Sequence, residues 1–271
     1  MKKISTFALL LIGSLSFAQA PKKIQLASGQ KIEIVMSNNS VTDLGMGMQM
    51  TNNSTVTNKM VVTAEDDNNF ELSSTITRMQ MTMEGMGQNM TFDSDKKEDM
   101  ESEMGQGLGD NLNKAETVKI NKLSGKQEKT KVEEKKEGNP MAGMSGMMGS
   151  EHESDLVFLI PTDKKIGDTW SEENKEKDLT TKRSYTLKSI DNNIATVTLT
   201  GSIDGTMEQE VQGNNMNMTI NTKMTGDLTV NIATGLVIKK NIVSDINGSI
   251  DMMGQQMPIS SKNTSAITYN Y

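Results

Sequence analysis

Cysteine is absent from this chain of 271 residues. Its absence excludes disulfides, thiolate metal sites, cysteine nucleophiles and a lipid anchor attached to an N-terminal cysteine. Small exported domains commonly depend on disulfides, but a chain of this length can bury a sizeable core without them. We therefore expect a fold stabilised by its hydrophobic core alone.

Histidine occurs once, at His152, and aromatic residues make up only 3% of the chain. A Ser-His-Asp triad or a histidine-based zinc site would have to use this one residue, which lies in the least patterned part of the sequence. The 35 Asp and Glu residues form many neighbouring pairs by chance, as on a solvated surface. We predict a non-catalytic protein without a cofactor, and a hydrolase using Asp and Glu is the least favoured alternative.

Long apolar runs are also missing, except for a short one near the N-terminus. Two lysines follow Met1, an apolar run extends from Phe7 to Phe17, and small residues come next. This pattern predicts a signal peptide over residues 1–18, cut before Gln19, or two residues later at the next alanine. The run is shorter than the roughly 20 residues of a membrane span. We expect a periplasmic or secreted protein with no transmembrane anchor.

The formal net charge is −7. An acidic balance disfavours nucleic acid and anionic lipid surfaces as partners, because both carry negative charge. The charge says nothing about the fold. An apolar ligand or a protein of the cell envelope is the partner class that remains, and its identity is unknown.

Alternating apolar residues indicate that strands are the main element. The phase of this alternation changes near Arg78, which predicts a bulge there. A turn is expected at 233–235, and a bulge or turn at Asn247-Gly248. Four-residue spacing of apolar residues from Met100 to Leu112 predicts one short helix, which its glycines weaken.

The two sides of a central segment resemble each other. Asp-Asn-Asn begins a strand at Asp67 and again at Asp191, and each side also has a matching glycine before its first strand and in a late turn. We interpret this order as a duplication. The predicted organisation is a first β-rich half over 19–125, a mobile Lys/Glu then Met/Gly linker over 126–154, and a second β-rich half over 155–271. The alternative is chance similarity of Asn- and Thr-rich strands.

These patterns predict a mainly β fold. We expect antiparallel curved sheets in two similar halves, with a short helix. A single β-sandwich is the alternative.

Methionine is the unusual component, with 24 residues. Some alternate along strands, as at Met79, Met81 and Met83, and others are found in the linker. Thioethers favour Cu(I), so the linker residues predict a soft-metal site for Cu(I) or Ag(I), formed by Met141, Met144, Met147, Met148 and His152. The other interpretation is a plastic apolar core or an apolar ligand surface, because methionine fills irregular spaces.

Several short motifs in order resemble one family. They are Ile76–Arg78 running to Thr91–Ser94, then Ile160-Pro161 with Gly167–Trp170, and Thr234–Leu236 near the end. This order is similar to that of an uncharacterised family of exported Bacteroidetes proteins, a domain of unknown function. The resemblance spans most of the predicted mature chain and implies no activity and no site residues. The Met/Gly linker is not part of the pattern.

The sequence thus favours a non-catalytic exported protein that binds an apolar ligand or a protein partner in the cell envelope. Soft-metal binding through the Met-rich segments is the alternative. A large apolar internal surface would favour the first, and converging methionine sulfurs would favour the second.

Overall fold

The fold is one large antiparallel sheet, seen in a computed structural model that describes residues 24–45, 47–85, 87–109, 112–129, 156–211, 214–252 and 255–271. Its first six strands are β1 (Lys31–Asp43), β2 (Gln49–Glu65), β3 (Asn69–Gly85), β4 (Gln88–Asp93), β5 (Ala115–Asn121) and β6 (Gln127–Lys129). The other six are β7 (Thr169–Glu176), β8 (Leu179–Asp191), β9 (Ile194–Val211), β10 (Asn214–Asn231), β11 (Leu236–Met252) and β12 (Gln255–Asn270). The mainly β, antiparallel prediction is confirmed.

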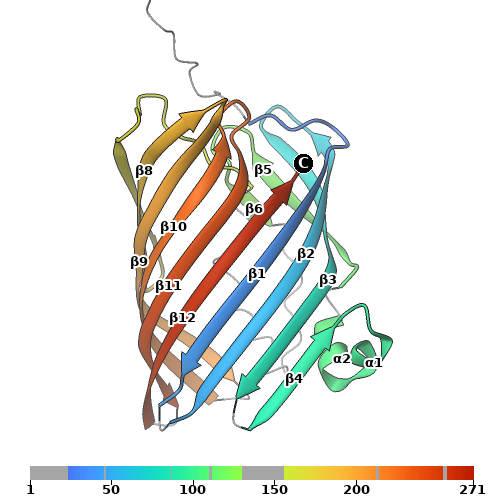
Figure 1. The fold of residues 1–271 in the computed structure, drawn as a ribbon, viewed down its shortest axis with the longest axis vertical. Helices are drawn as coiled ribbons and strands as arrows, with labels where there is room; N and C mark the ends of the chain where they lie inside the picture. The colour runs from blue at the N-terminus through green and yellow to red at the C-terminus, as the bar shows by residue number, and fades with distance from the viewer. Residues whose placement is uncertain are drawn as a thin grey trace, which may run out of the picture.

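The strand order is β6-β5-β3-β2-β1-β12-β11-β10-β9-β8-β7, with β4 added beside β3. We expected curved sheets in the plural, or a sandwich of two. The described strands instead form one sheet, because β1 pairs with β12 from Glu33–Asn270 to Asp43–Ser260 and joins the two halves. Figure 1 shows this sheet twisting and curling, so that β8 and β9 on one side and β5 and β6 on the other turn behind the central strands. A sheet that curls in this way can enclose its own core.

The helical segment lies between β4 and β5. Instead of one helix up to Leu112, the chain forms α1 (Lys97–Glu101) and α2 (Glu103–Gly109). Ser102 breaks the helix because its backbone is extended, with ψ 163°, and its hydroxyl accepts the backbone N–H of Gly105 at 3.1 Å. A serine in this position caps the second helix. No helix in the described ranges is long and apolar enough to cross a bilayer.

Two of the three predicted irregularities are confirmed. The β2–β3 register shifts between Thr57, which pairs with Arg78, and Asn58, which pairs with Ile76, so one extra residue is bulged in β3. A turn lies at 232–235. The prediction at Asn247-Gly248 is wrong, because β11 runs straight through it in register with β10. A Cβ on Gly248 would lie 2.0 Å from the Thr219 carbonyl oxygen, so this glycine permits a close approach of two strands.

The sheet contains two five-stranded meanders, and the same pattern of backbone hydrogen bonds occurs in both. The N–H of Gly29 donates to the Val62 carbonyl at 2.9 Å before β1, and that of Gly167 donates to the Leu187 carbonyl at 2.8 Å before β7. One residue after Val62 and one after Leu187, the register of each hairpin skips a residue. The order β1-β2-β3-β5-β6 thus corresponds to β7-β8-β9-β10-β11, with β4, α1 and α2 inserted in the first meander.

The late turns of the two meanders also correspond. The N–H of Gly125 donates to the Asn121 carbonyl at 2.9 Å, and that of Gly235 donates to the Asn231 carbonyl at 2.8 Å. Lys122 and Ile232, the next residues after these asparagines, donate to the carbonyls of Asn68 and Asn193. Sequence letters alone match Asn69 with Asn193. Hydrogen bonding instead matches Asn68 with Asn193, because the first hairpin loop spans 66–69 and pairs Asp66 with Asn69 as Asp191 pairs with Ile194.

The predicted segment boundaries fall partly on described residues. Strand β6 occupies 127–129, inside the predicted linker, and pairs with β5. Residues 130–154 of that linker and the predicted signal peptide, residues 1–18, lie outside the described residues.

The hydrophobic core lies at one end of the sheet, here called the closed end, where β1 begins and β12 ends. Paired strand residues such as Ile34 and Tyr269 form it together with two segments, 24–26 and 156–160. Segment 24–25 bridges the two late turns, since Ile24 donates to the Lys122 carbonyl and Gln25 to the Thr234 carbonyl. A Cβ on Gly125 would lie 2.9 Å from the Val157 side chain, so the late turn at Gly125 packs tightly against segment 156–160.

Candidate ligand-binding face

The face of the sheet that carries the core is called the inner face. Because side chains alternate along a strand, the cross-strand register decides which residues share this face. Every strand methionine whose side chain the structure describes lies on it: Met36, Met50, Met60, Met79, Met81, Met83, Met90, Met207, Met218, Met224 and Met257. The described part of the outer face therefore carries no strand methionine.

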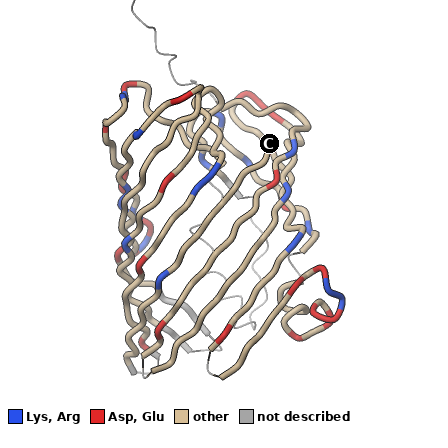
Figure 2. Tube along the Cα trace, in the orientation of Figure 1, with Lys and Arg blue, Asp and Glu red and all other residues tan. Residues whose placement is uncertain are grey.

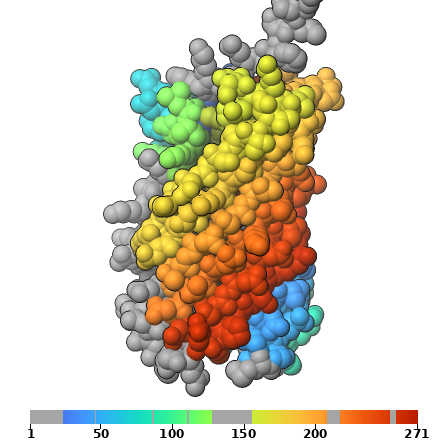
Figure 3. Space-filling model, turned by 90° about the vertical axis from the view of Figure 1, so that its left-hand side faces the viewer, coloured from blue at the N-terminus to red at the C-terminus, as the bar shows by residue number. Residues whose placement is uncertain are grey.

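The outer face is polar and thinly charged. Figure 2 shows few Lys, Arg, Asp and Glu residues along the long strands, and Figure 3 shows β7 (yellow) to β12 (red) as a continuous outer wall. Between the charges the wall carries Thr, Ser and Asn, for example Thr198, Thr200 and Asn241. A shallow groove of about 510 Å³ crosses this face over β1–β3 and β12.

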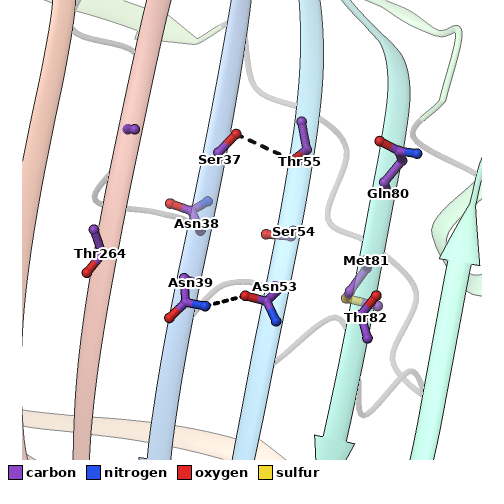
Figure 4. A pocket seen from close by; sticks show the side chains of 11 residues that line it. Ser37, Asn38, Asn39, Asn53, Ser54, Thr55, Gln80, Met81, Thr82 and Thr264 are labelled. Atoms are coloured by element: carbon purple, nitrogen blue, oxygen red, sulfur yellow. Dashed lines mark hydrogen bonds between the residues drawn. The ribbon is translucent and has the colours of Figure 1, made fainter.

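Hydrogen bonds between neighbouring strands link the side chains along this groove. Ser37 and Thr55 hydroxyls lie 3.4 Å apart, and the Asn39 amide donates to the Asn53 side chain, as Figure 4 shows. These groups satisfy one another. These two pairs of side chains in the outer groove are therefore already hydrogen-bonded within the protein.

The inner face beyond the core has two kinds of surface. Toward the end opposite the closed end, apolar side chains line it, including Met79, Met81 and Met83 on β3 and Ile246 and Ile250 on β11. These five side chains are half-buried, whereas Met60 and Leu72 in the core are 2% and 0% exposed. Apolar groups that keep contact with water can be covered further by a ligand.

A cluster of small polar residues lies between the core and this apolar surface. Its members face inward from four neighbouring strands, and we call it the inner polar patch: Asn38, Ser40, Asn52, Ser54, Ser244, Asn263 and Ser265. Asn38 is opposite both Ser54 and Ser265 in the register. Lys240, only 6% exposed, lies on the same face next to Ile267.

The residues predicted as a metal site cannot be placed on this face. Met141, Met144, Met147, Met148 and His152 all lie outside the described residues, and the soft-metal site stays a prediction. Within the described ranges, no three His, Asp or Glu side chains gather closely enough to hold a metal ion.

Two carboxylates of the described residues stabilise turns. The Asp66 carboxylate accepts the backbone N–H groups of Asn68 and Asn69, both at 2.7 Å, which holds its pKa below the ordinary value. Hydrogen bonds from the Asp95 backbone and the Gln80 amide lower the pKa of Asp93 in the same way. None of the buried residues in the described part of the chain is Asp or Glu. The described acids therefore give no buried, closely opposed pair of carboxylates, which is the feature that would favour the hydrolase alternative.

Sequence reasoning missed the inner polar patch and Lys240. Polar residues occupy both faces of β1 and β2 here, as in the run Ser37 to Ser40, so no alternation marks the inner side. The two-residue spacing of the strand methionines was the sequence signal that could identify the inner face, because the register places every described one of them there.

Residues 148–237 match the model of a family of unknown function (DUF6263). The expected resemblance to a domain of unknown function is confirmed by this match, while its source and its export stay predictions. No curated protein sequence matches the chain.

Among solved structures, lipovitellin is similar in fold, with a TM-score of 0.51 and 9% identity over 91% of this chain. The chain spans about a quarter of that protein, 26% of its length. An outer membrane channel from Pseudomonas putida F1 aligns with 91% of this chain and 97% of its own at 8% identity, but with a TM-score of only 0.24. The likeness to lipovitellin therefore concerns the fold alone.

Proposed function

We propose that this protein is a non-catalytic binding protein that holds the acyl chain of a lipid-like ligand against its inner face. The observation that carries the proposal is the placement of all described strand methionines on one face of a sheet whose other face is polar. Methionine side chains are flexible and polarisable, so a surface built from them adapts to a flexible chain. A rigid aromatic pocket would instead select one shape.

The partial exposure of these methionines supports a ligand rather than a finished core. Met79, Met81 and Met83 are half-buried, and Met90 is 37% exposed. Burying one methylene group contributes about 0.8 kcal/mol, so ten methylenes placed here would supply about 8 kcal/mol before ordering costs are subtracted. The fifteen apolar carbons of palmitate would supply about 12 kcal/mol, and an ordering cost of about 4 kcal/mol would leave about 8 kcal/mol, which corresponds to a dissociation constant in the micromolar range.

Two further points agree with an acyl ligand. The solved structure of similar fold concerns lipid–protein interactions in lipovitellin, which are a property of that protein. The predicted signal peptide would bring this chain to the cell envelope, where free and membrane lipids are available. We therefore place the proposed function in the periplasm or outside the cell, with the ligand or an envelope protein as partner.

Binding of a fluorescent fatty acid tests the proposal. The protein is stripped of copurified lipid and titrated with 11-(dansylamino)undecanoic acid, and the dansyl emission is recorded. We expect a saturable, blue-shifted signal with a dissociation constant in the micromolar range, which palmitate displaces. Palmitate should also raise the melting temperature, because a ligand that binds only the folded state stabilises it by about 2.7 kcal/mol at 100 times its dissociation constant. A linear, non-saturating signal from folded protein would contradict the proposal.

A further inference from the structure

We infer that the inner polar patch binds the polar head of the acyl ligand, and that this head carries a hydroxyl or a primary amide. The inference rests on the proposed function and names its ligand class more closely. It joins two surfaces on one face, the patch at the centre and the methionines beside it.

Two atoms at the centre of the patch point to a ligand. The Ser265 hydroxyl oxygen is buried without a hydrogen-bond partner, and the residue is only 2% exposed. The side-chain oxygen of Asn38, directly opposite in the register, is also buried without a partner. A buried polar atom that makes no hydrogen bond is costly, so natural proteins satisfy nearly all of them.

Two pairs of neighbouring polar residues on the same face are hydrogen-bonded to each other. Thr42 and Ser261 hydroxyls lie 2.8 Å apart. The Asn58 amide donates to Ser74 at 2.9 Å, and the Ser74 hydroxyl lies 3.2 Å from the Asn58 oxygen. The strands are thus close enough for such bonds above and below Asn38 and Ser265.

The chemistry of the pair selects the head group. A carboxamide oxygen needs a donor, and a serine hydroxyl both donates and accepts. A hydroxyl or a primary amide supplies both functions at one point, whereas an ether or a simple ester has no donor. From Asn38, the register leads through Ser54 to Met81, so a head at the patch places its chain beside the methionines of β3.

The test compares 1-dodecanol with 1-methoxydodecane, which has the same chain but no donor, as competitors of the dansyl probe. The wild type is expected to bind the alcohol about tenfold more tightly than the ether, the effect of a hydrogen bond made to a buried group. The double variant Asn38→Leu/Ser265→Ala should lose this preference while binding the ether as before. Asn39→Leu/Thr264→Ala, which changes adjacent residues on the outer face, should keep the wild-type preference.

The outcomes separate this inference from the proposed function. Equal binding of alcohol and ether by the wild type overturns the inference and leaves acyl binding intact. Failure of both compounds and of palmitate to displace the probe overturns acyl binding as well. The ligand-free melting temperature provides a second readout, because replacing an unpartnered buried hydroxyl in Ser265→Ala should not destabilise the protein. A drop of more than about 5 °C would show that Ser265 is satisfied within the protein, and would overturn the inference.

Discussion

Replacing Gly226 with alanine is expected to lower the free energy of unfolding by about 3 kcal/mol. Gly226 lies on the inner face of β10 between Leu199 and Ile242, and an added Cβ would lie 2.2 Å from the Asn241 carbonyl oxygen. That oxygen belongs to the backbone, so β10 and β11 would have to separate. The tight coiling of the sheet around its inner face depends on this approach.

Gly29→Ala is the matched control. Gly29 has a φ of 73°, so alanine is strained there, but an added Cβ would meet nothing within 4 Å. Backbone strain of this kind costs about 1 kcal/mol. Denaturant unfolding followed by circular dichroism measures both variants. Equal losses in the two would show that the close approach of β10 and β11 contributes nothing to stability.

Met81→Glu is expected to weaken binding of the dansyl fatty acid at least tenfold, about 1.4 kcal/mol. The side chain at position 81 lies on the inner face beside Ser54. A bound acyl chain would surround the glutamate carboxylate with apolar atoms, and burying an unpaired charge in this way costs free energy. Thr82→Glu, the next residue on the same strand, faces outward and should change binding less than twofold. Because Thr82 lines the outer groove, weaker binding in Thr82→Glu alone would place the ligand on the outer face instead.

Local features of this fold could be predicted from sequence because they depend on neighbouring residues. The phase change at Arg78 marks a real bulge, and the Asp-Asn-Asn turns join hairpins whose backbone favours those residues. Asn192 and Asn193 both have positive φ, which asparagine tolerates better than most residues. The landmarks shared by the two meanders are turn residues of the same kind, such as Gly125 and Gly235, and their origin in a duplication stays a prediction.

The single sheet could not be predicted, because it depends on pairing between the two ends of the described chain. Strands β1 and β12 are separated by most of the sequence, and nothing in the pattern of Ser37 to Ser40 specifies Ser260 to Ser265 as partners. The helix prediction missed its break because Ser102 acts through its own hydroxyl, which a four-residue apolar spacing does not reveal. The candidate ligand face likewise required the register, since it gathers residues from β1–β4 and β9–β12.

The most direct test of an acyl ligand on the inner face is paramagnetic NMR of the methionine methyl groups. Protein labelled with ¹³C at these methyls is mixed with 16-doxyl stearate, and spectra are compared with those after the nitroxide is reduced. We expect line broadening at Met79, Met81 and Met83, with Met100 and Met104 on α1 and α2 unaffected. Broadening of the helix methyls with sharp signals from β3, or no broadening at saturating ligand, would contradict the account.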